Sequence, residues 1–350
     1  MRRPSVFLVV AFVLAAGAVR AQAPPQTLFE RYLEALRMQA GIPGLAAAIV
    51  QDGRTVWEGG FGYRDVEALL PALPDTPFPI ADLTQTFAAT LLLQCAERGQ
   101  IELTAPIARW SALVPEPGAE VRHVLAHASE GAPGSTFRFA PARFAALTPA
   151  IEACGDTAYR RLLVDEVLDR LAMVDSVPGT DVAIDGAPAQ ALFEPDELSR
   201  YAAVLARLAV PYRVDRNGKA SRSEYPAPAV DAATGLVSTG RDLAKFDVAL
   251  TTDVLLLPDT RAVAWSNAVS TAGAPLPTGL GWFVQTYNGE RIVWHFGTLP
   301  NAASSLMLHV PGRRLTLVML ANSDGLGTSL SDGDVTASPF ARLFLRMFLL

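Results

Sequence analysis

Lysine is nearly absent from this sequence. Lys219 and Lys245 are the only two lysines among 29 basic residues, so almost all of the positive charge belongs to arginine. Neither lysine has a serine three positions before it, and no G-x-S-x-G segment occurs anywhere in the chain. These absences exclude two arrangements that activate a serine hydroxyl as a nucleophile, the Ser-x-x-Lys pair and the serine elbow between a strand and a helix.

Charged residues are also sparse. They make up 18% of the 350 residues, hydrophobic residues make up 50%, and the formal net charge is −6. Such a composition supports a large buried core and excludes wholesale disorder. The acidic balance is a poor match for nucleic acid or for an anionic membrane surface. We therefore expect no nucleic-acid partner.

The first 21 residues have the pattern of a secretory signal peptide. Arg2 and Arg3 precede an apolar run at 6–18, and small residues place the expected cleavage after Ala21. The apolar run is short for a membrane span. We expect a secreted or periplasmic bacterial protein with no transmembrane span after cleavage.

The chain has two cysteines, Cys95 and Cys154, and both fall on apolar stretches of helical character. An oxidising compartment would allow them to pair. Free cysteines are among the most buried side chains and behave as small hydrophobic residues. Two buried thiols are the expected state.

Apolar runs and turn residues predict strands near both ends of the chain and helices between them. Asp52-Gly53 and Asn288-Gly289 are hairpin turns in this pattern. The predicted strands are 45–50, 56–63, 279–284, 291–294, 304–310 and 315–320. The predicted helices are 26–39, 83–97, 142–153, 159–171, 194–208 and 340–350.

The stretch Thr76–Glu97 combines an extended, proline-containing entry with a long apolar helix. Asp82 precedes that helix and Gln85 follows three positions later, which is the pattern of a capping box. The carboxylate of Asp82 is then expected to accept first-turn N–H groups and to be held as the anion by the helix dipole. This helix start is the first candidate functional position.

The same stretch resembles the active-site helix of the serine β-lactamase and penicillin-binding-protein superfamily, in its class C, D-alanyl-D-alanine carboxypeptidase and esterase branch. Members read approximately F-x-I-G-S-x-S-K-x-F-T-A, whereas this chain reads FPIADLTQTFAA from Phe78 to Ala89. The position of the serine nucleophile holds Asp82, and the position of the lysine holds Gln85. The resemblance therefore implies a degenerate catalytic helix.

Two further motifs of the resemblance are also altered. The family's P-G-x-x-F-x-Y-S-N segment falls on residues 133–141, so its proton-shuttling tyrosine is Phe139 and its substrate-binding asparagine is Pro141. The family's third motif, H/K-T-G, falls on His295, Phe296 and Gly297, where only the threonine is replaced. The resemblance thus implies a cleft lined by Asp82, Gln85, Phe139, Pro141, His295, Phe296 and Gly297, with no catalytic residue assigned.

His123 and His127 are four residues apart in a predicted helix, which invites a zinc interpretation. The pattern lacks the glutamate of H-E-x-x-H and has no evident third ligand. The segment also resembles the family's R-H-L-L-T-H-T-S-G, in which both histidines are structural. We expect no metal and no cofactor.

The resemblance extends over about residues 42–324 and implies an α+β fold of the β-lactamase/transpeptidase type. An antiparallel sheet from both chain ends would be flanked by helices and interrupted by a mostly helical insertion. The expected organisation is a signal peptide (1–21) and one β-lactamase-related domain (22–350), with an α/β part at 24–81 and 226–350 and a helical region at 82–225.

Loss of the nucleophile, the lysine and the tyrosine indicates a serine-hydrolase homologue without catalytic activity. Such a protein would act by binding a cell-wall peptide or a protein partner. An alternative is an active esterase or peptidase with relocated catalytic residues, in which Thr84 or Thr86 is the nucleophile and His295 the base. A third alternative is a structural or oligomer-forming envelope protein.

Overall fold

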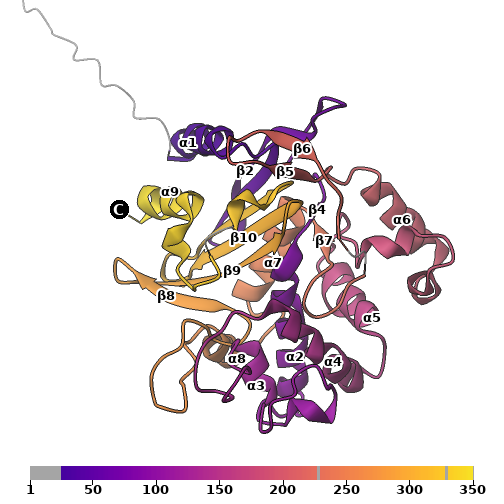
Figure 1. Ribbon diagram of the computed structural model, residues 1–350, viewed down its shortest axis with the longest axis vertical. Helices are drawn as coiled ribbons and strands as arrows, with labels where there is room; N and C mark the ends of the chain where they lie inside the picture. The colour runs from indigo at the N-terminus through magenta and orange to yellow at the C-terminus, as the bar shows by residue number, and fades with distance from the viewer. Residues whose placement is uncertain (1–24, 227–228, 328–329, 350) are drawn as a thin grey trace, which may run out of the picture.

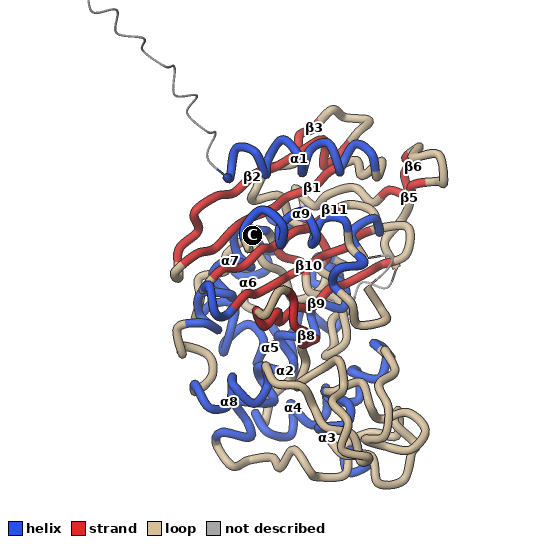
Figure 2. The backbone as a smooth tube through the Cα atoms, turned by 90° about the vertical axis from the view of Figure 1, so that its left-hand side faces the viewer, coloured by secondary structure: helices blue, strands red, loops and turns tan. Residues whose placement is uncertain are grey.

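The computed structural model describes residues 25–226, 229–327 and 330–349. The expected signal peptide lies outside the described residues. Figure 1 shows a central sheet with helices on both faces. Figure 2 shows most strands in the upper part of the molecule, with α2 (Thr84–Glu97), α3 (Val121–Leu125), α4 (Thr148–Gly155) and α8 (Pro258–Ala264) below. This arrangement is the predicted α+β architecture.

The central sheet is antiparallel and has the strand order β3-β2-β1-β11-β10-β9-β8. Leu45 in β1 lies opposite Ala321 in β11, so strands from the two ends of the chain are neighbours in the middle of the sheet. The sheet built from both chain ends is therefore confirmed. Its strands are β1 (Gly44–Gln51), β2 (Arg54–Asp65), β3 (Leu70–Pro71), β8 (Phe283–Tyr287), β9 (Glu290–Leu299), β10 (Ala303–Val310) and β11 (Leu315–Ala321).

The predicted strand 279–284 is wrong over residues 279–282, because β8 begins only at Phe283. Gly279 packs so tightly that a Cβ atom there would lie 2.1 Å from the carbonyl oxygen of Ala264. Gly281 has a φ of +79°, which strand residues do not adopt. This stretch is an irregular segment pressed against its neighbours.

Alternating side chains along β1 separate two hydrophobic cores. Leu45, Ala47 and Ile49 face α1 (Pro25–Gln39) and α9 (Pro339–Phe348), whereas the alternate residues face α2 and α7 (Gly240–Thr251). Figure 1 shows α1 and α9 side by side on one face of the sheet. Successive side chains of a strand point to opposite faces of the sheet, so a fully buried strand contributes to the hydrophobic core on each face.

The helical region contains the helix that carries the candidate site. It comprises α2 (Thr84–Glu97), α3 (Val121–Leu125), α4 (Thr148–Gly155), α5 (Tyr159–Leu163) and α6 (Pro195–Leu205), and α8 (Pro258–Ala264) follows α7. The predicted helix 142–153 is instead a 3-10 segment at Pro141–Leu147 followed by α4, with a proline in the first turn of each. Two short strand pairs complete the fold, β4 (Phe78–Pro79) with β7 (Val237–Ser238) and β5 (Tyr212–Val214) with β6 (Ala220–Arg222).

Cys95 and Cys154 form a disulfide, so the expectation of two free thiols is wrong. Their Cα atoms are 6.1 Å apart, because α2 and α4 pack against each other. Helical periodicity places each cysteine on a buried face but says nothing about which helices are neighbours. The bond links two helices that are 59 residues apart in sequence.

Candidate functional site

The start of α2 is built by a short turn between the strand β4 and the helix. Residues Ala81–Leu83 form one 3-10 turn, and α2 begins at Thr84 with no side-chain cap. The predicted capping box is therefore wrong, because Asp82 lies in the turn that precedes the helix. Ala81 has a φ of 53°, a left-handed conformation that is unfavourable for a residue with a side chain. This turn directs Asp82 toward β9.

The strand β9 crosses this turn at Gly297. A Cβ atom at position 297 would lie 2.2 Å from the carbonyl oxygen of Ile80 and 2.7 Å from the amide nitrogen of Asp82. Only glycine allows the two backbones to approach so closely. Gly297 therefore sets the distance between the sheet and the mouth of α2.

The carboxylate of Asp82 is the acceptor for the backbone donors at this crossing. The N–H of Thr298 donates to Oδ2 of Asp82 at 3.3 Å, and the backbone N–H of Asp82 itself also interacts with the carboxylate. Two convergent backbone N–H groups are the usual means of stabilising an oxyanion in acyl transfer. Here the N–H of Thr298 is already bonded to a side chain of the protein.

Burial changes the charge state that the sequence suggested for Asp82. Desolvation raises the pKa of its carboxyl to about 7, although the N–H groups of Thr298 and Asp82 act in the opposite direction. The expectation that the helix start would hold this group as an anion is wrong. The cost of removing a carboxylate from water exceeds the gain from the two donors.

Gln85 lies one helical turn beyond Asp82 and is fully buried. Its amide nitrogen donates to the carbonyl oxygen of Pro141 at 3.4 Å, and its amide oxygen has no hydrogen-bond partner among the described residues. The structure therefore brings Gln85 and Pro141 together, as the resemblance implied. An amide has no basic lone pair that could take a proton from a nucleophile.

Aromatic rings occupy the side of the site where the family has a tyrosine. Phe139 stacks on Phe296 with ring centroids 5.0 Å apart, and the ring of His127 is 4.9 Å from that of Phe139. Phe139 is half-buried and Phe296 is buried. This wall is apolar, with no hydroxyl on either phenylalanine to move a proton.

His295 is buried in β9 and does not face a hydroxyl. Its Nδ1 lies 2.8 Å from the carbonyl oxygen of Phe296, and its Nε2 has no partner among the described residues. Burial lowers its pKa to about 4, so the ring is neutral at pH 7. The hydroxyls of Thr84 and Thr86 donate to the carbonyl oxygens of residues 81 and 83 at 2.7 and 2.8 Å. The relocated active site would need a hydrogen bond between His295 and the hydroxyl of Thr84 or Thr86, and neither hydroxyl makes one.

The two histidines of the zinc interpretation do not share a helical face. The helix α3 ends at Leu125, and His127 has a φ of 50° beyond that end. Nδ1 of His123 accepts from the N–H of Glu120 at 3.1 Å, and Nδ1 of His127 accepts from the N–H of Ala140 at 3.4 Å. Burial lowers the pKa of His127 to about 3. In the described parts of the chain, no group of three or more His, Cys, Asp or Glu residues could hold a metal ion.

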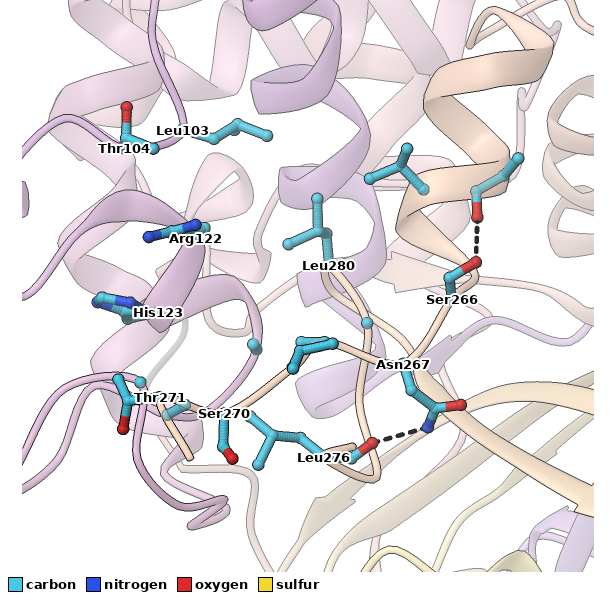
Figure 3. Close-up of a pocket in the computed structure, with 18 residues that line it drawn as sticks. Leu103, Thr104, Arg122, His123, Ser266, Asn267, Ser270, Thr271, Leu276 and Leu280 are labelled. Carbon is cyan, nitrogen blue, oxygen red and sulfur yellow. Dashed lines mark hydrogen bonds between the residues drawn. The ribbon is translucent and has the colours of Figure 1, made fainter. Parts of the chain in front are cut away.

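Sequence reasoning missed Thr298, which follows the 295–297 motif directly and supplies a backbone donor to Asp82. It also missed a cavity of about 790 Å³ that lies between α3, α8 and the segment 266–280 (Figure 3). None of the seven predicted cleft residues lines this cavity. No sequence signal identified it, because its walls are ordinary aliphatic residues from distant segments.

Comparison with known proteins agrees with the resemblance seen in the sequence motifs. The profile of a family described as Beta-lactamase matches residues 28–337. Serine beta-lactamase-like protein LACTB, mitochondrial, from Mus musculus is 30% identical over 111 residues, which cover 29% of this chain and 20% of that protein. Protein flp from Staphylococcus aureus (strain N315) is 29% identical over 84 residues, covering 24% of this chain and 17% of that protein. The matched part is thus about a fifth of the length of these relatives.

Solved structures show the same fold at low sequence identity. The octameric penicillin-binding protein homologue from Pyrococcus abyssi has a TM-score of 0.71 and 20% identity, over 89% of this chain and 76% of that chain. The penicillin binding protein from Bacillus halodurans has a TM-score of 0.67 and 17% identity, over 84% of this chain and 95% of that chain.

Proposed function

This chain belongs to the beta-lactamase family, and from that premise we propose that it is a member without acyl-transfer activity whose remaining role is binding. One observation carries the proposal. The carboxylate of Asp82 stands where the resemblance places the nucleophile and accepts a hydrogen bond from the N–H of Thr298 at 3.3 Å. A donor that would stabilise an oxyanion is thus directed at the protein itself.

The chemistry of acyl transfer explains why this arrangement is inert. A hydroxyl must attack a carbonyl, a base must take its proton, and free donors must receive the developing charge. At the matched positions the chain has a carboxyl group, the amide of Gln85 and the ring of Phe139. Loss of a serine nucleophile alone reduces kcat by about a millionfold, which is about 8 kcal/mol of barrier.

We further propose that the protein acts in an oxidising compartment outside the cytoplasm and that its ligand there is a cell-wall peptide or a protein partner. The leader pattern at residues 1–21 supports secretion. The disulfide between Cys95 and Cys154 supports an oxidising environment. None of the helices in the described part of the chain has the length and apolar character needed to cross a membrane.

Covalent labelling tests the loss of activity directly. We expect the purified mature protein to give no adduct with a fluorescent penicillin or with a fluorophosphonate, as measured by gel fluorescence and intact mass. The matched control is the triple variant Asp82→Ser, Gln85→Lys, Phe139→Tyr, which restores the three residue types that the resemblance places at these positions. It is assayed with the same probes and with a chromogenic cephalosporin. An acyl adduct on the wild-type protein would overturn the proposal. Substrate turnover by the wild-type protein that disappears in the His295→Ala variant would favour the alternative of a relocated active site.

A further inference from the structure

The cavity beside α3 has the size of a small-molecule site. Its volume is about 790 Å³, and ligand-binding clefts typically have about 300–1,000 Å³. Figure 3 shows Leu103 and Leu280 above the chain segment that carries Ser270 and Leu276, with Arg122 and His123 on the α3 side. The cavity is therefore bounded by three parts of the chain that are distant in sequence.

Half of the residues that line the cavity are aliphatic. Val263 and Val269 are 60% and 67% exposed, although both are large apolar side chains. Exposed valines that line a concave surface lose their contact with water when an apolar ligand covers them. The aliphatic lining consists of Leu103, Val263, Val269, Leu276 and Leu280, together with Ala126, Ala128, Ala262 and Ala268.

Hydrogen bonds hold the 266–280 wall in place. The amide nitrogen of Asn267 donates to the carbonyl oxygens of Leu276 and Val284 at 2.7 and 2.9 Å, and Figure 3 shows the first of these bonds. The hydroxyl of Thr278 donates to the carbonyl oxygen of Ala126 at 2.6 Å and ties this wall to the end of α3. A cavity that is formed before binding requires little ordering when a ligand enters.

The cationic group at the cavity is Arg122, which is paired with Glu120 through one nitrogen and, within the described residues, keeps free donors on the other two. The lining contains no aspartate or glutamate, and its charged side chain is Arg122, on the same wall as His123. Glu120 binds Nε of Arg122 at 2.6 Å, which leaves the two terminal nitrogens of the guanidinium without a partner in the described structure. A guanidinium presents such nitrogens in a geometry that suits a carboxylate.

We propose that this cavity binds a linear alkyl carboxylate, with its aliphatic tail against Leu103, Leu276 and Leu280 and its carboxylate on the terminal nitrogens of Arg122. The apolar wall selects a hydrocarbon chain, and the single cationic group selects an acid over an alcohol or an amine of the same length. The site is separate from Asp82, so it does not depend on whether the family's chemistry has been lost.

Titration with the fluorescent fatty acid 11-(dansylamino)undecanoic acid tests the site on the purified full mature chain. We expect saturable binding that dodecanoate displaces. Ala262→Trp places a ring over the cavity from an exposed position of α8, and we expect it to weaken probe binding at least tenfold. The matched control is Ala203→Trp, an exposed position of α6 away from the cavity. Val263→Asp, at the mouth, provides a second blocking variant.

A competition series tests the head group. We expect dodecanoate to displace the probe at concentrations at least tenfold lower than dodecanol or dodecylamine, and Arg122→Gln to remove that preference. Arg31→Gln, an exposed position of α1, is the control that should leave it unchanged. The proposal is overturned if the probe does not bind, if both blocking variants bind it like the wild type, or if the amine competes as well as the acid.

Discussion

Asp82 is a carboxyl group surrounded by protein on the side that faces β9. Its carboxylate accepts a hydrogen bond from the N–H of Thr298, yet burial raises its pKa to about 7. The pKa of an aspartate in an unfolded chain is about 3.9. Between these two values the folded protein retains a proton that the unfolded chain has lost, so the stability of the fold depends on pH in this range.

The Asp82→Asn variant measures this dependence. The contribution of the protonated carboxyl is fully present below about pH 4 and is lost as the pH rises through 7, so this carboxyl by itself lowers the unfolding free energy by on the order of 3 kcal/mol between pH 5 and pH 8. The lowered pKa values of His127 and His295 act in the opposite direction below pH 6.5, because the unfolded chain binds protons there that the folded protein does not. The two histidines contribute equally to both proteins, so we expect the unfolding free energy of the wild type minus that of Asp82→Asn to fall by about 3 kcal/mol from pH 5 to pH 8, measured by urea unfolding at pH 5, 7 and 8. The exposed Asp185→Asn is the control, and it should retain the wild-type slope. An unchanged slope in Asp82→Asn would show that the carboxyl is already ionised at pH 5.

Ala81 adopts a left-handed φ of 53° immediately before Asp82. An L-residue with a Cβ atom pays about 1–2 kcal/mol in this region, whereas glycine does not. The Ala81→Gly variant should therefore increase the free energy of unfolding by about 0.5–1 kcal/mol, measured by urea denaturation. Ala88→Gly, in the interior of α2, is the matched comparison and should decrease it by about 1 kcal/mol. A loss of stability in Ala81→Gly would contradict this account of the turn.

At the scale of elements, the packing of the helical region depends on direct contacts between its helices, such as the one between α2 and α4. The disulfide joins Cys95 of α2 to Cys154 of α4, and Cys95 is 2% exposed. A cross-link across 59 residues restricts the unfolded chain strongly. The bond therefore stabilises the packing of α2, whose first turn carries the candidate site.

Removal of this bond should lower stability. The double variant Cys95→Ala, Cys154→Ala is expected to lose about 2–4 kcal/mol of unfolding free energy. The measurement is urea denaturation followed by circular dichroism, with and without a reductant. Reductant should destabilise the wild-type protein and leave the double variant unchanged. If the wild type does not respond to a reductant that has opened the bond, the bond does not contribute to stability.

At the scale of the whole molecule, the two ends of the chain form one layer. Phe29 of α1 and Phe344 of α9 are both buried, and their ring centroids are 6.1 Å apart. Both helices cover the same face of a sheet in which β1 pairs with β11. The fold therefore cannot be completed until the last helix is in place.

Phe344→Ala should show this dependence. Truncation of a buried phenylalanine typically costs about 3–5 kcal/mol, through lost burial and the cavity that remains. We expect a decrease of that size in the unfolding free energy, with near- and far-ultraviolet circular dichroism reporting the same transition. Arg346→Ala, exposed on the same helix, should change stability by less than about 0.5 kcal/mol. Separate transitions in the two spectra would show that α9 unfolds independently.

The family and an antiparallel sheet built from both ends of the chain could be predicted from the sequence. Turns such as Asp52-Gly53 and the apolar run at 45–50 are local signals, so they can be read without a structure. The presence of Asp82 and Gln85 at the positions where the resemblance places a serine and a lysine could also be read from the sequence, because the flanking residues align the motif. These features depend on residues that are close together in the chain.

Only the tertiary structure decided the environment and the partners of those residues. The pKa of Asp82, the pairing of Cys95 with Cys154 and the cavity beside Arg122 each arise from segments that are far apart in sequence. Desolvation and interhelical distance are properties of the packed molecule, and local periodicity contains no information about them. The sequence by itself thus determined which groups are present and in what fold, and the packing determined their charge, their partners and the space between them.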